Sequence, residues 1–314
     1  MDKNECYGKP WILQRADPYV TLEDGKYYFT ASVPEYDRIA LRCSDELETL
    51  AEAEEIEIWH CHESGPMSKH IWAPELHRID GEWYIYFAGG EKEDVWKIRP
   101  YVLHCEGSDP MKDPWTECGK MQPADDDEFS FEAFSLDMTV FEDAGRWYCV
   151  WAEKVGVGKQ ISNLYIAEME SPTKLKTVQV LLTTPDYDWE RGSFWVDEGP
   201  GVIKRADNIY LTFSANDTGV NYCIGMMSAK TGTDLLDPLN WKKDRYPVLK
   251  SDYEKGIYGP GHNYFTTDAD GNDVMVYHAR TETEIVGDPL YNPNRHAFLM
   301  KLDWDENDRP VFKL

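Results

Sequence analysis

Five ionisable residues occur at comparable places along this chain, each shortly before an aromatic-rich segment: Asp17, Glu75, Asp137, Glu198 and His262. Carboxyl and imidazole groups are those that proteins most often use to donate and accept protons. Considered singly, each has a structural explanation, because Asp17 and Asp137 can cap turns and Glu75 can pair with a nearby Arg or His. Burying several carboxylates together is costly unless they share protons, bind a metal or act on a substrate. The set therefore predicts a catalytic site.

The elements that must position these residues are repeated segments. Five copies begin at Ala16, Ala73, Ser135, Asp197 and Gly259. In each copy a short strand is followed by a turn (EDG, IDG, EDAG, RADN or DADG) and by a second strand, mostly rich in aromatic residues, which is the pattern of a β-hairpin. The apolar runs RIALRCS, YVLHCEG, NLYIAEM and CIGMMSA are predicted third strands, and EIEIWH and PVLK are candidate fourth strands. Repeated four-stranded units predict an all-β fold, a five-bladed β-propeller.

No Ser-, Gly- or Pro-rich linker divides the 314 residues, so residues 1–314 are predicted to form a single propeller domain. In a propeller the innermost strand of each blade runs along the central axis. The five ionisable residues begin these strands, so they are expected to converge at one mouth of the axial channel. This places the predicted active site on the central axis.

The chain carries a net charge of −26, from 58 acidic and 32 basic residues. Its electrostatic field would repel nucleic acid and anionic membrane surfaces, so neither is an expected partner. The sequence contains no run of about 18 apolar residues that could span a membrane. The seven Cys residues form no CxxC pair, and the N-terminus shows no apolar leader. Together these features predict a cytoplasmic protein.

Two carboxyl groups on opposite sides of a sugar suffice for glycoside hydrolysis. One protonates the departing oxygen, and the other attacks the anomeric carbon or activates a water molecule. A third acid nearby keeps the pKa of the proton donor high, because like charges disfavour ionisation. Most of the 12 Trp and 19 Tyr residues suit packing between blades, but a few could instead stack on the face of a sugar. Composition alone leaves both interpretations open.

The candidate residues and their contexts resemble those of glycoside hydrolase family 43, whose members are five-bladed propellers: Asp17 in RADPYV, Trp72 in WAPELH, Asp137 in SLDMT, Glu198 in WVDEGP and His262 in YGPGH. The resemblance covers essentially the whole chain. It implies that Asp17 is the general base, Glu198 the general acid, and Asp137 the acid that orients and tunes Glu198. Members of the family invert configuration, so carboxyl groups roughly 6.5 to 9.5 Å apart are expected, with a water molecule beside Asp17.

The resemblance also implies a set of substrate-binding residues: Trp72, Phe134, Trp195, His262 and Arg280. No cofactor is implied as required. The axial His of related enzymes can hold a hydrated Ca²⁺ ion, although one imidazole is a small contribution for a cation that prefers oxygen. His262 is therefore expected on the axis, with Ca²⁺ as an optional ligand. Arg280 would hydrogen-bond a sugar hydroxyl or keep a carboxylate ionised. Its alternative role is an ion pair at the surface or between blades.

Asp197 and Glu198 provide an internal test of the alignment. Side chains alternate along a strand, so only one of the two can face the axis. Glu198 is expected to face it, with Asp197 turned into the blade. By the same alternation, whether the side chain of Trp195 faces the axis depends on whether a bulge separates it from Glu198.

The stretches SVPEYDRIAL, HESGPMSKHIWAPE and IVGDPLYNPNRHAF resemble those of single-domain α-L-arabinofuranosidases. This implies release of terminal α-L-arabinofuranose from α-1,5-linked arabino-oligosaccharides. A β-xylosidase is one alternative, although many of those carry an additional β-sandwich for which 314 residues leave no room. An endo-arabinanase is another, and it needs an open groove. A propeller that only binds a ligand or a protein partner would have no use for the three carboxylates together.

Overall fold

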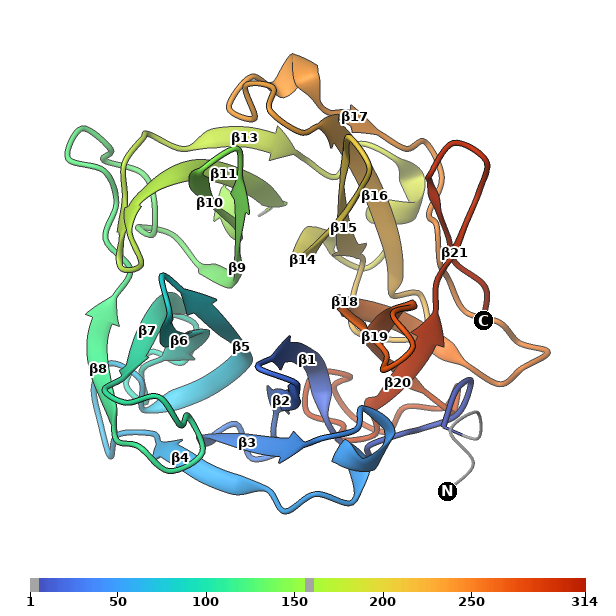
Figure 1. Cartoon of the computed structure of the whole chain (residues 1–314), viewed down its shortest axis with the longest axis horizontal. Helices are drawn as coiled ribbons and strands as arrows, with labels where there is room; N and C mark the ends of the chain where they lie inside the picture. Colours follow the sequence, from blue (N-terminus) through green and yellow to red (C-terminus); the bar gives the residue numbers. More distant parts are fainter. Residues whose placement is uncertain (1–5, 156–160) are drawn as a thin grey trace.

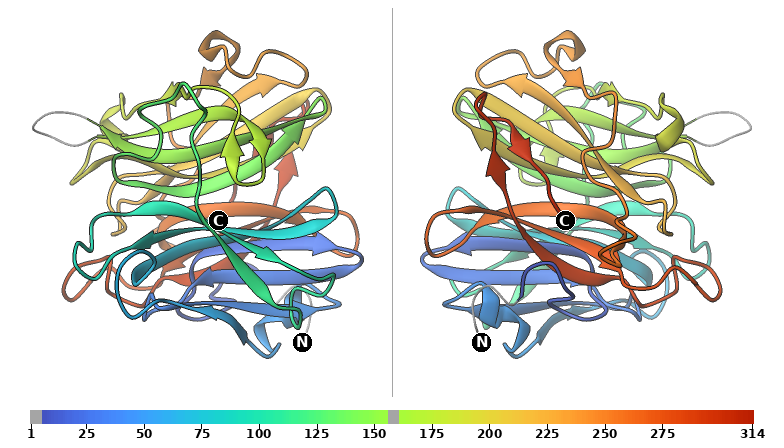
Figure 2. Two further views of the ribbon diagram at one scale, coloured as in Figure 1. Left: turned by 90° about the vertical axis from the view of Figure 1, so that its left-hand side faces the viewer. Right: turned by 90° about the vertical axis from the view of Figure 1, so that its right-hand side faces the viewer.

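The computed structural model describes residues 6–155 and 161–314. Its strands form five blades around one central axis, so the structure is the all-β, five-bladed propeller that the repeats predict (Figure 1). Views from the side show the strands running roughly along that axis (Figure 2). Blades three and four are joined into one continuous sheet by a short parallel pairing of Ile161 with Trp195 and of Ser162 with Val196. No helix among the described residues is long and apolar enough to cross a membrane.

The strands follow the blades in chain order. Blade one contains β1 (Ala16–Glu23), β2 (Lys26–Ser32), β3 (Arg38–Ser44) and β4 (Ile56–His60). Blade two contains β5 (Lys69–Ile79), β6 (Glu82–Gly90), β7 (Arg99–Cys105) and β8 (Trp115–Lys120). Blade three contains β9 (Ser135–Asp143), β10 (Arg146–Val155), β11 (Ile161–Ser171) and β13 (Val180–Thr183). Blade four contains β14 (Trp195–Arg205), β15 (Asn208–Ala215), β16 (Cys223–Lys230) and β17 (Lys242–Lys243), and blade five contains β18 (Tyr258–Thr267), β19 (Asp273–Arg280) and β20 (His296–Lys301).

Short elements complete the chain. They are the strands β12 (Lys174–Leu175), β21 (Asp303–Trp304) and β22 (Pro310–Val311), and the 3₁₀ helices η1 (Glu48–Ala51), η2 (Asp188–Glu190) and η3 (Pro238–Asn240). The four predicted third strands are confirmed as β3, β7, β11 and β16, and EIEIWH contains β4. PVLK is not a fourth strand, because it contributes only an isolated bridge between Leu249 and Ile224. The outermost strand of that blade is β17.

Residues before the first blade complete the last one. The main chain of Trp11 donates to the carbonyl of Ala297 in β20 (2.8 Å), and Ala297 donates in return to Ile12 (2.9 Å). Trp11 and Ile12 also pack into the apolar cluster between blades five and one, which includes Phe29 and Val276. The ring of blades is therefore closed by pairing between the two ends of the chain.

Every innermost strand has a β-bulge at the same place, and this bulge positions the axial side chains. The first bulged residues have left-handed φ values: Asp17 (53°), Ala73 (47°), Asp137 (53°), Gly199 (55°) and His262 (45°). Such bulges re-aim side chains and are common beside active sites. For a residue other than glycine, this backbone conformation costs on the order of 1–3 kcal/mol, which the surrounding sheet must offset.

The bulges correct the alignment of the repeats. The residue of blade two that is equivalent to Asp17 and Asp137 is Ala73, and Glu75 lies two positions further along the strand. Glu198 immediately precedes the bulge of its strand, where Gly199 is the first bulged residue. The sequence pattern could not reveal these offsets, because a bulge adds a residue to a strand without changing its composition.

Candidate active site

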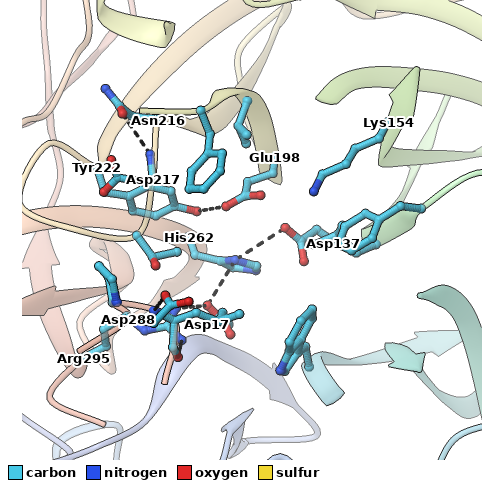
Figure 3. Close-up of a pocket in the computed structure, with 18 of the residues that line it drawn as sticks. Asp17, Asp137, Lys154, Glu198, Asn216, Asp217, Tyr222, His262, Asp288 and Arg295 are labelled. Atoms are coloured by element: carbon cyan, nitrogen blue, oxygen red, sulfur yellow. Dashed lines mark hydrogen bonds and ion pairs between the residues drawn. The ribbon is translucent and has the colours of Figure 1, made fainter. Parts of the chain in front are cut away.

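A cavity of about 380 Å³ opens at the axis, a volume near the lower end of the range for small-molecule sites. Each blade contributes at least one residue from its innermost strand: Asp17 from β1, Trp72 from β5, Asp137 from β9, Glu198 from β14 and His262 from β18. Figure 3 shows the three carboxylates and the imidazole facing one another across this cavity. The arrangement brings together the groups that acid and base catalysis on a sugar requires.

Asp17 lies buried in a polar setting. Its Oδ2 accepts a hydrogen bond from Ser32 Oγ (2.5 Å). Its Oδ1 lies 3.3 Å from His262 Nδ1 and 3.6 Å from Arg295 Nη1. The main-chain N–H of Asp17 donates to His278 Nδ1 (3.1 Å), so that nitrogen carries no proton. The cations that face the Asp17 carboxylate are therefore Arg295 and, when protonated, His262.

These neighbours set the charge of Asp17. Burial opposes ionisation, but the charges of His262 and Arg295 outweigh it and hold the pKa of Asp17 well below its usual range. Burial lowers the pKa of His278 to about 3, so this imidazole is neutral, consistent with its acceptor role. Asp17 is thus a carboxylate throughout the neutral pH range, which is the state a general base needs.

The pKa values of Asp137 and Glu198 are raised, whereas that of Asp17 is lowered. Asp137 Oδ2 accepts the main-chain N–H of Gly199 (3.0 Å), and Glu198 Oε1 accepts from the hydroxyl of Tyr222 (2.8 Å). Burial, together with the charge of Glu198, raises the pKa of Asp137 to about 8. Burial also raises the pKa of Glu198. Two interacting carboxyl groups of this kind titrate as a pair, which keeps one proton in the neutral range.

His262 lies between the two Asp residues. Its Nδ1 is 3.3 Å from Asp17 Oδ1 and 3.8 Å from Asp137 Oδ2 (Figure 3), and its main-chain N–H donates to Ser214 Oγ (2.6 Å). Burial disfavours an imidazolium, but the charge of Asp17 and then that of Asp137 raise the pKa of His262 above its ordinary value. When His262 is protonated, its positive charge stabilises the Asp17 carboxylate.

A Ca²⁺ ion finds few protein ligands at this position. The described ranges contain no group of three His, Cys, Asp or Glu side chains that could hold a metal ion. Ca²⁺ takes six to eight oxygen ligands, whereas His262 presents a nitrogen whose raised pKa favours its protonated form. The residues present do not fit a protein-built Ca²⁺ site, and we derive no chemical step through this ion.

Two of the three predicted aromatic residues, Trp72 and Phe134, line the cavity. Trp195 does not line it, and its ring lies under the guanidinium of Arg191 (4.7 Å). The reason is alternation: the bulge of β14 begins only after Glu198, so Val196 and Glu198 face the cavity and Trp195 faces away.

Asp197 also faces away from the cavity, as the alternation predicts. It is fully buried inside blade four, where its Oδ2 accepts from Thr183 Oγ1 (3.2 Å) and lies 3.4 Å from Lys243 Nζ. Lys243 in turn pairs with Glu190 (2.5 Å). The adjacent acids Asp197 and Glu198 therefore have separate surroundings.

Arg280 does not line the cavity. It is buried and donates to the carbonyls of Thr218 (3.2 Å) and Pro289 (2.7 Å) and to Asn292 Oδ1 (2.7 Å), so it holds the loop between β19 and β20. The arginine that faces Asp17 is Arg295, which precedes β20. It lies outside the repeated segments, within the stretch NPNRHAF, so the repeats gave no signal for it.

Glu75 does not line the cavity either. It lies deeper, where its Oε2 is 2.7 Å from His77 Nε2 and His77 Nδ1 is 3.3 Å from the hydroxyl of Tyr19. Conversely, the sequence pattern missed several lining residues, among them Trp96, Lys154, Asn216 and Tyr222. Each of these four lies in a loop, at a strand end or before a third strand, where no repeated pattern distinguishes residues of the site from their neighbours.

Comparisons with known proteins agree with this geometry. The profile of the family described as Glycosyl hydrolases family 43 matches residues 7–310. The chain is 48% identical over 285 residues to the extracellular exo-alpha-(1->5)-L-arabinofuranosidase of Streptomyces chartreusis, covering 90% of this chain and 85% of that protein. A protein of the same name from Streptomyces avermitilis is 43% identical, and the match spans 63% of its length. The crystal structure of an alpha-L-arabinofuranosidase from Lactobacillus brevis superimposes with a TM-score of 0.92 at 45% identity, covering 98% of this chain and 96% of that one.

Both Streptomyces relatives are named extracellular enzymes, which contradicts the cytoplasmic location predicted from the sequence. That prediction gave too much weight to the cysteines. Cys105, Cys149 and Cys223 are buried and form no disulfide. A buried thiol behaves as a small apolar group. Since such thiols are shielded from solvent, they carry little information about the compartment.

Proposed function

Because the chain belongs to the glycosyl hydrolases of family 43, we propose that it releases terminal α-L-arabinofuranose from α-1,5-linked arabino-oligosaccharides with inversion of configuration. The observation that carries the proposal is the set of three carboxyl groups around one small axial cavity: Asp17 faces cations, and the pKa values of Asp137 and Glu198 are raised. The names and coverage of its relatives support the choice of sugar. Enzymes of this family generally need no cofactor.

In the proposed reaction Asp17 is the general base. Its pKa is low, so it is ionised and can accept a proton from a water molecule as the water oxygen attacks the anomeric carbon. Arg295 and His262 face this carboxylate and hold it in place. Neither transfers its own proton to Asp17, so Asp17 stays able to accept one from water. One attack from this side forms the new C–O bond with inverted configuration.

Glu198 is the proposed general acid. The hydroxyl of Tyr222 donates to its Oε1, which leaves Oε2 to carry a proton to the glycosidic oxygen as the bond to the anomeric carbon breaks. Asp137 is proposed to keep the pKa of Glu198 high through the repulsion between the two carboxyl groups. The proton taken by Asp17 and the one lost by Glu198 balance, so the products are arabinose and a shortened oligosaccharide.

The shape of the cavity supports release of a single terminal sugar. In addition to the five innermost strands, the loop between β19 and β20 lines it with Asp288, Pro289 and Leu290. A cavity of about 380 Å³ that such a loop borders suits one sugar ring better than the middle of a long chain. An endo-arabinanase or a β-xylosidase is therefore the second choice.

The test is hydrolysis of 4-nitrophenyl α-L-arabinofuranoside, 4-nitrophenyl β-D-xyloside and α-1,5-arabinotriose by the parent protein and by Glu198→Gln. The proposal expects arabinose release from the first and third substrates, and NMR should detect the inverted anomer first. Activity on the xyloside alone would move the assignment to a β-xylosidase. No activity on any of the three would favour a propeller that only binds its ligand.

A further inference from the structure

Lys154 brings a cationic group to the cavity, and its charge lowers the pKa of Glu198. It is the next-to-last residue of β10, it lines the cavity, and its side chain points inward (Figure 3). Its main-chain N–H donates to the carbonyl of Phe134 (2.8 Å), and its Nζ lies 3.9 Å from the centre of the Phe134 ring. Within residues 6–155 and 161–314, the structure gives its ammonium no oxygen acceptor and no ion-pair partner.

An ammonium group in this position has unmet hydrogen-bonding capacity. It has three donors, and only the face of Phe134 approaches it. Lys154 is partly buried, and this burial lowers its pKa. Placing a charged group away from water without a partner is unfavourable. Acceptor oxygens of a molecule bound in the cavity would supply the missing partners, and sugar hydroxyls are such oxygens.

The position of Lys154 indicates which part of the substrate it faces. Lys154 enters the cavity on the side of Glu198 and Asp137, whereas Asp17 and Arg295 lie across the cavity (Figure 3). The charge of Glu198 is also the one that acts on Lys154. In an inverting hydrolysis the water approaches beside the base, and the leaving group departs beside the acid. Lys154 therefore faces the leaving group.

We propose that Lys154 determines specificity for the leaving group by donating a hydrogen bond from Nζ to a hydroxyl oxygen of the second arabinose unit, the one that departs. This inference rests on the proposed function. It explains why a cation stands next to the proposed acid, on the aromatic face of Phe134, without an acceptor of its own. It also predicts that Lys154 distinguishes sugar leaving groups from those without hydroxyl groups.

The test compares two substrates with the same terminal sugar: α-1,5-arabinobiose and phenyl α-L-arabinofuranoside, whose aglycone has no hydroxyl group. The variant Lys154→Met keeps a similar side-chain length but has no donor. Its kcat/KM should fall roughly 10- to 100-fold on arabinobiose, as expected for a lost hydrogen bond from a charged group. On the phenyl substrate it should stay within about threefold of the parent. Lys112→Met is the matched control, since Lys112 is exposed and does not line the cavity, and activity on both substrates should be unchanged.

Other outcomes overturn the proposal. An equal loss on both substrates would mean that Lys154 contacts the terminal sugar, and full activity on arabinobiose would mean that it contacts neither sugar. A loss confined to arabinobiose that comes with an alkaline limb of kcat/KM moved to higher pH would mean that Lys154 acts through the pKa of Glu198, which its charge lowers. If Lys154→Met fails to fold, as judged by thermal unfolding, Lys154→Gln and Lys154→Ala decide. Lys154→Gln retains a hydrogen-bond donor, so its kcat/KM on arabinobiose should fall less than that of Lys154→Ala, which has none. If the parent hydrolyses neither substrate, the proposed function itself fails, and the inference fails with it.

Discussion

The guanidinium of Arg295 lies 3.6 Å from the carboxylate of Asp17 and contributes to its low pKa. Replacing it by Met should therefore raise the pKa of Asp17. Activity is present above that pKa and is lost as the pH falls through it, so the acid limb of kcat/KM should move up by about one to two pH units. The pH profile of Arg295→Met against the parent measures this shift.

Two controls accompany this prediction. Arg295→Lys keeps the positive charge, so its acid limb should stay closer to that of the parent. Arg280→Met removes a buried arginine that holds a loop but does not line the cavity, so its acid limb should not move even if its stability falls. A parent-like acid limb in Arg295→Met would show that this cation does not control the base.

Deprotonation of Asp137 and Glu198 should determine the alkaline limb of the pH profile of kcat/KM. Both pKa values are raised, that of Asp137 to about 8, so the active protonated form is present at lower pH and is lost as the pH rises through this region. Asp137→Asn removes the repulsion that keeps the proton on Glu198. Its alkaline limb should therefore move to lower pH, by about one unit or more. An unchanged or higher limb would contradict the pairing.

The adjacent acids of β14 should give different results when each is changed. Glu198→Gln should reduce activity on arabinotriose by about 10²- to 10⁴-fold, with a much smaller loss on 4-nitrophenyl α-L-arabinofuranoside, whose leaving group needs little protonation. Asp197→Asn changes a side chain that faces Lys243 and not the cavity. Any loss it causes should be the same for both substrates. A leaving-group dependence in Asp197→Asn would contradict the assignment of the acid.

Lys243 should be important for stability. It pairs with the buried carboxylates of Glu190 and Asp197, so Lys243→Met leaves two buried acids without their cation. Removing one partner of a buried ion pair costs about 3–5 kcal/mol in the free energy of unfolding, which urea denaturation measures. Lys313→Met breaks an exposed pair with Asp303 and should change that free energy by less than about 1 kcal/mol. Similar losses in both variants would contradict this account.

The sequence was sufficient for the part of the fold that repeats. Hairpin turns and aromatic strands located the innermost strands of the blades, and family motifs within them indicated Asp17, Asp137 and Glu198, which meet in one cavity. The pattern failed where a β-bulge, which composition does not reveal, changes the residue at the axial position. A bulge shifts the axial position of blade two from Glu75 to Ala73.

Residues outside the repeats were also missed. Arg295, Lys154 and Tyr222 reach the cavity from a loop, a second strand and the approach to a third strand. Their place depends on contacts between segments far apart in the chain. Arg280 and Arg295 both flank the same loop, and only the path of that loop decides which of them faces Asp17.

The pairing of Ile12 with Ala297 has a consequence for biosynthesis. At roughly 5–20 residues per second, a ribosome needs on the order of 15 to 60 seconds to make the chain between these two residues. During that interval the early apolar segment around Trp11 has no partner from blade five, and the apolar side chains of the first blade that pack against blade five stay uncovered. Closure of so long a loop is also an intrinsically slow step. The nascent chain thus remains vulnerable to aggregation until β20 emerges, because β20 supplies the pairing partner of the segment around Trp11.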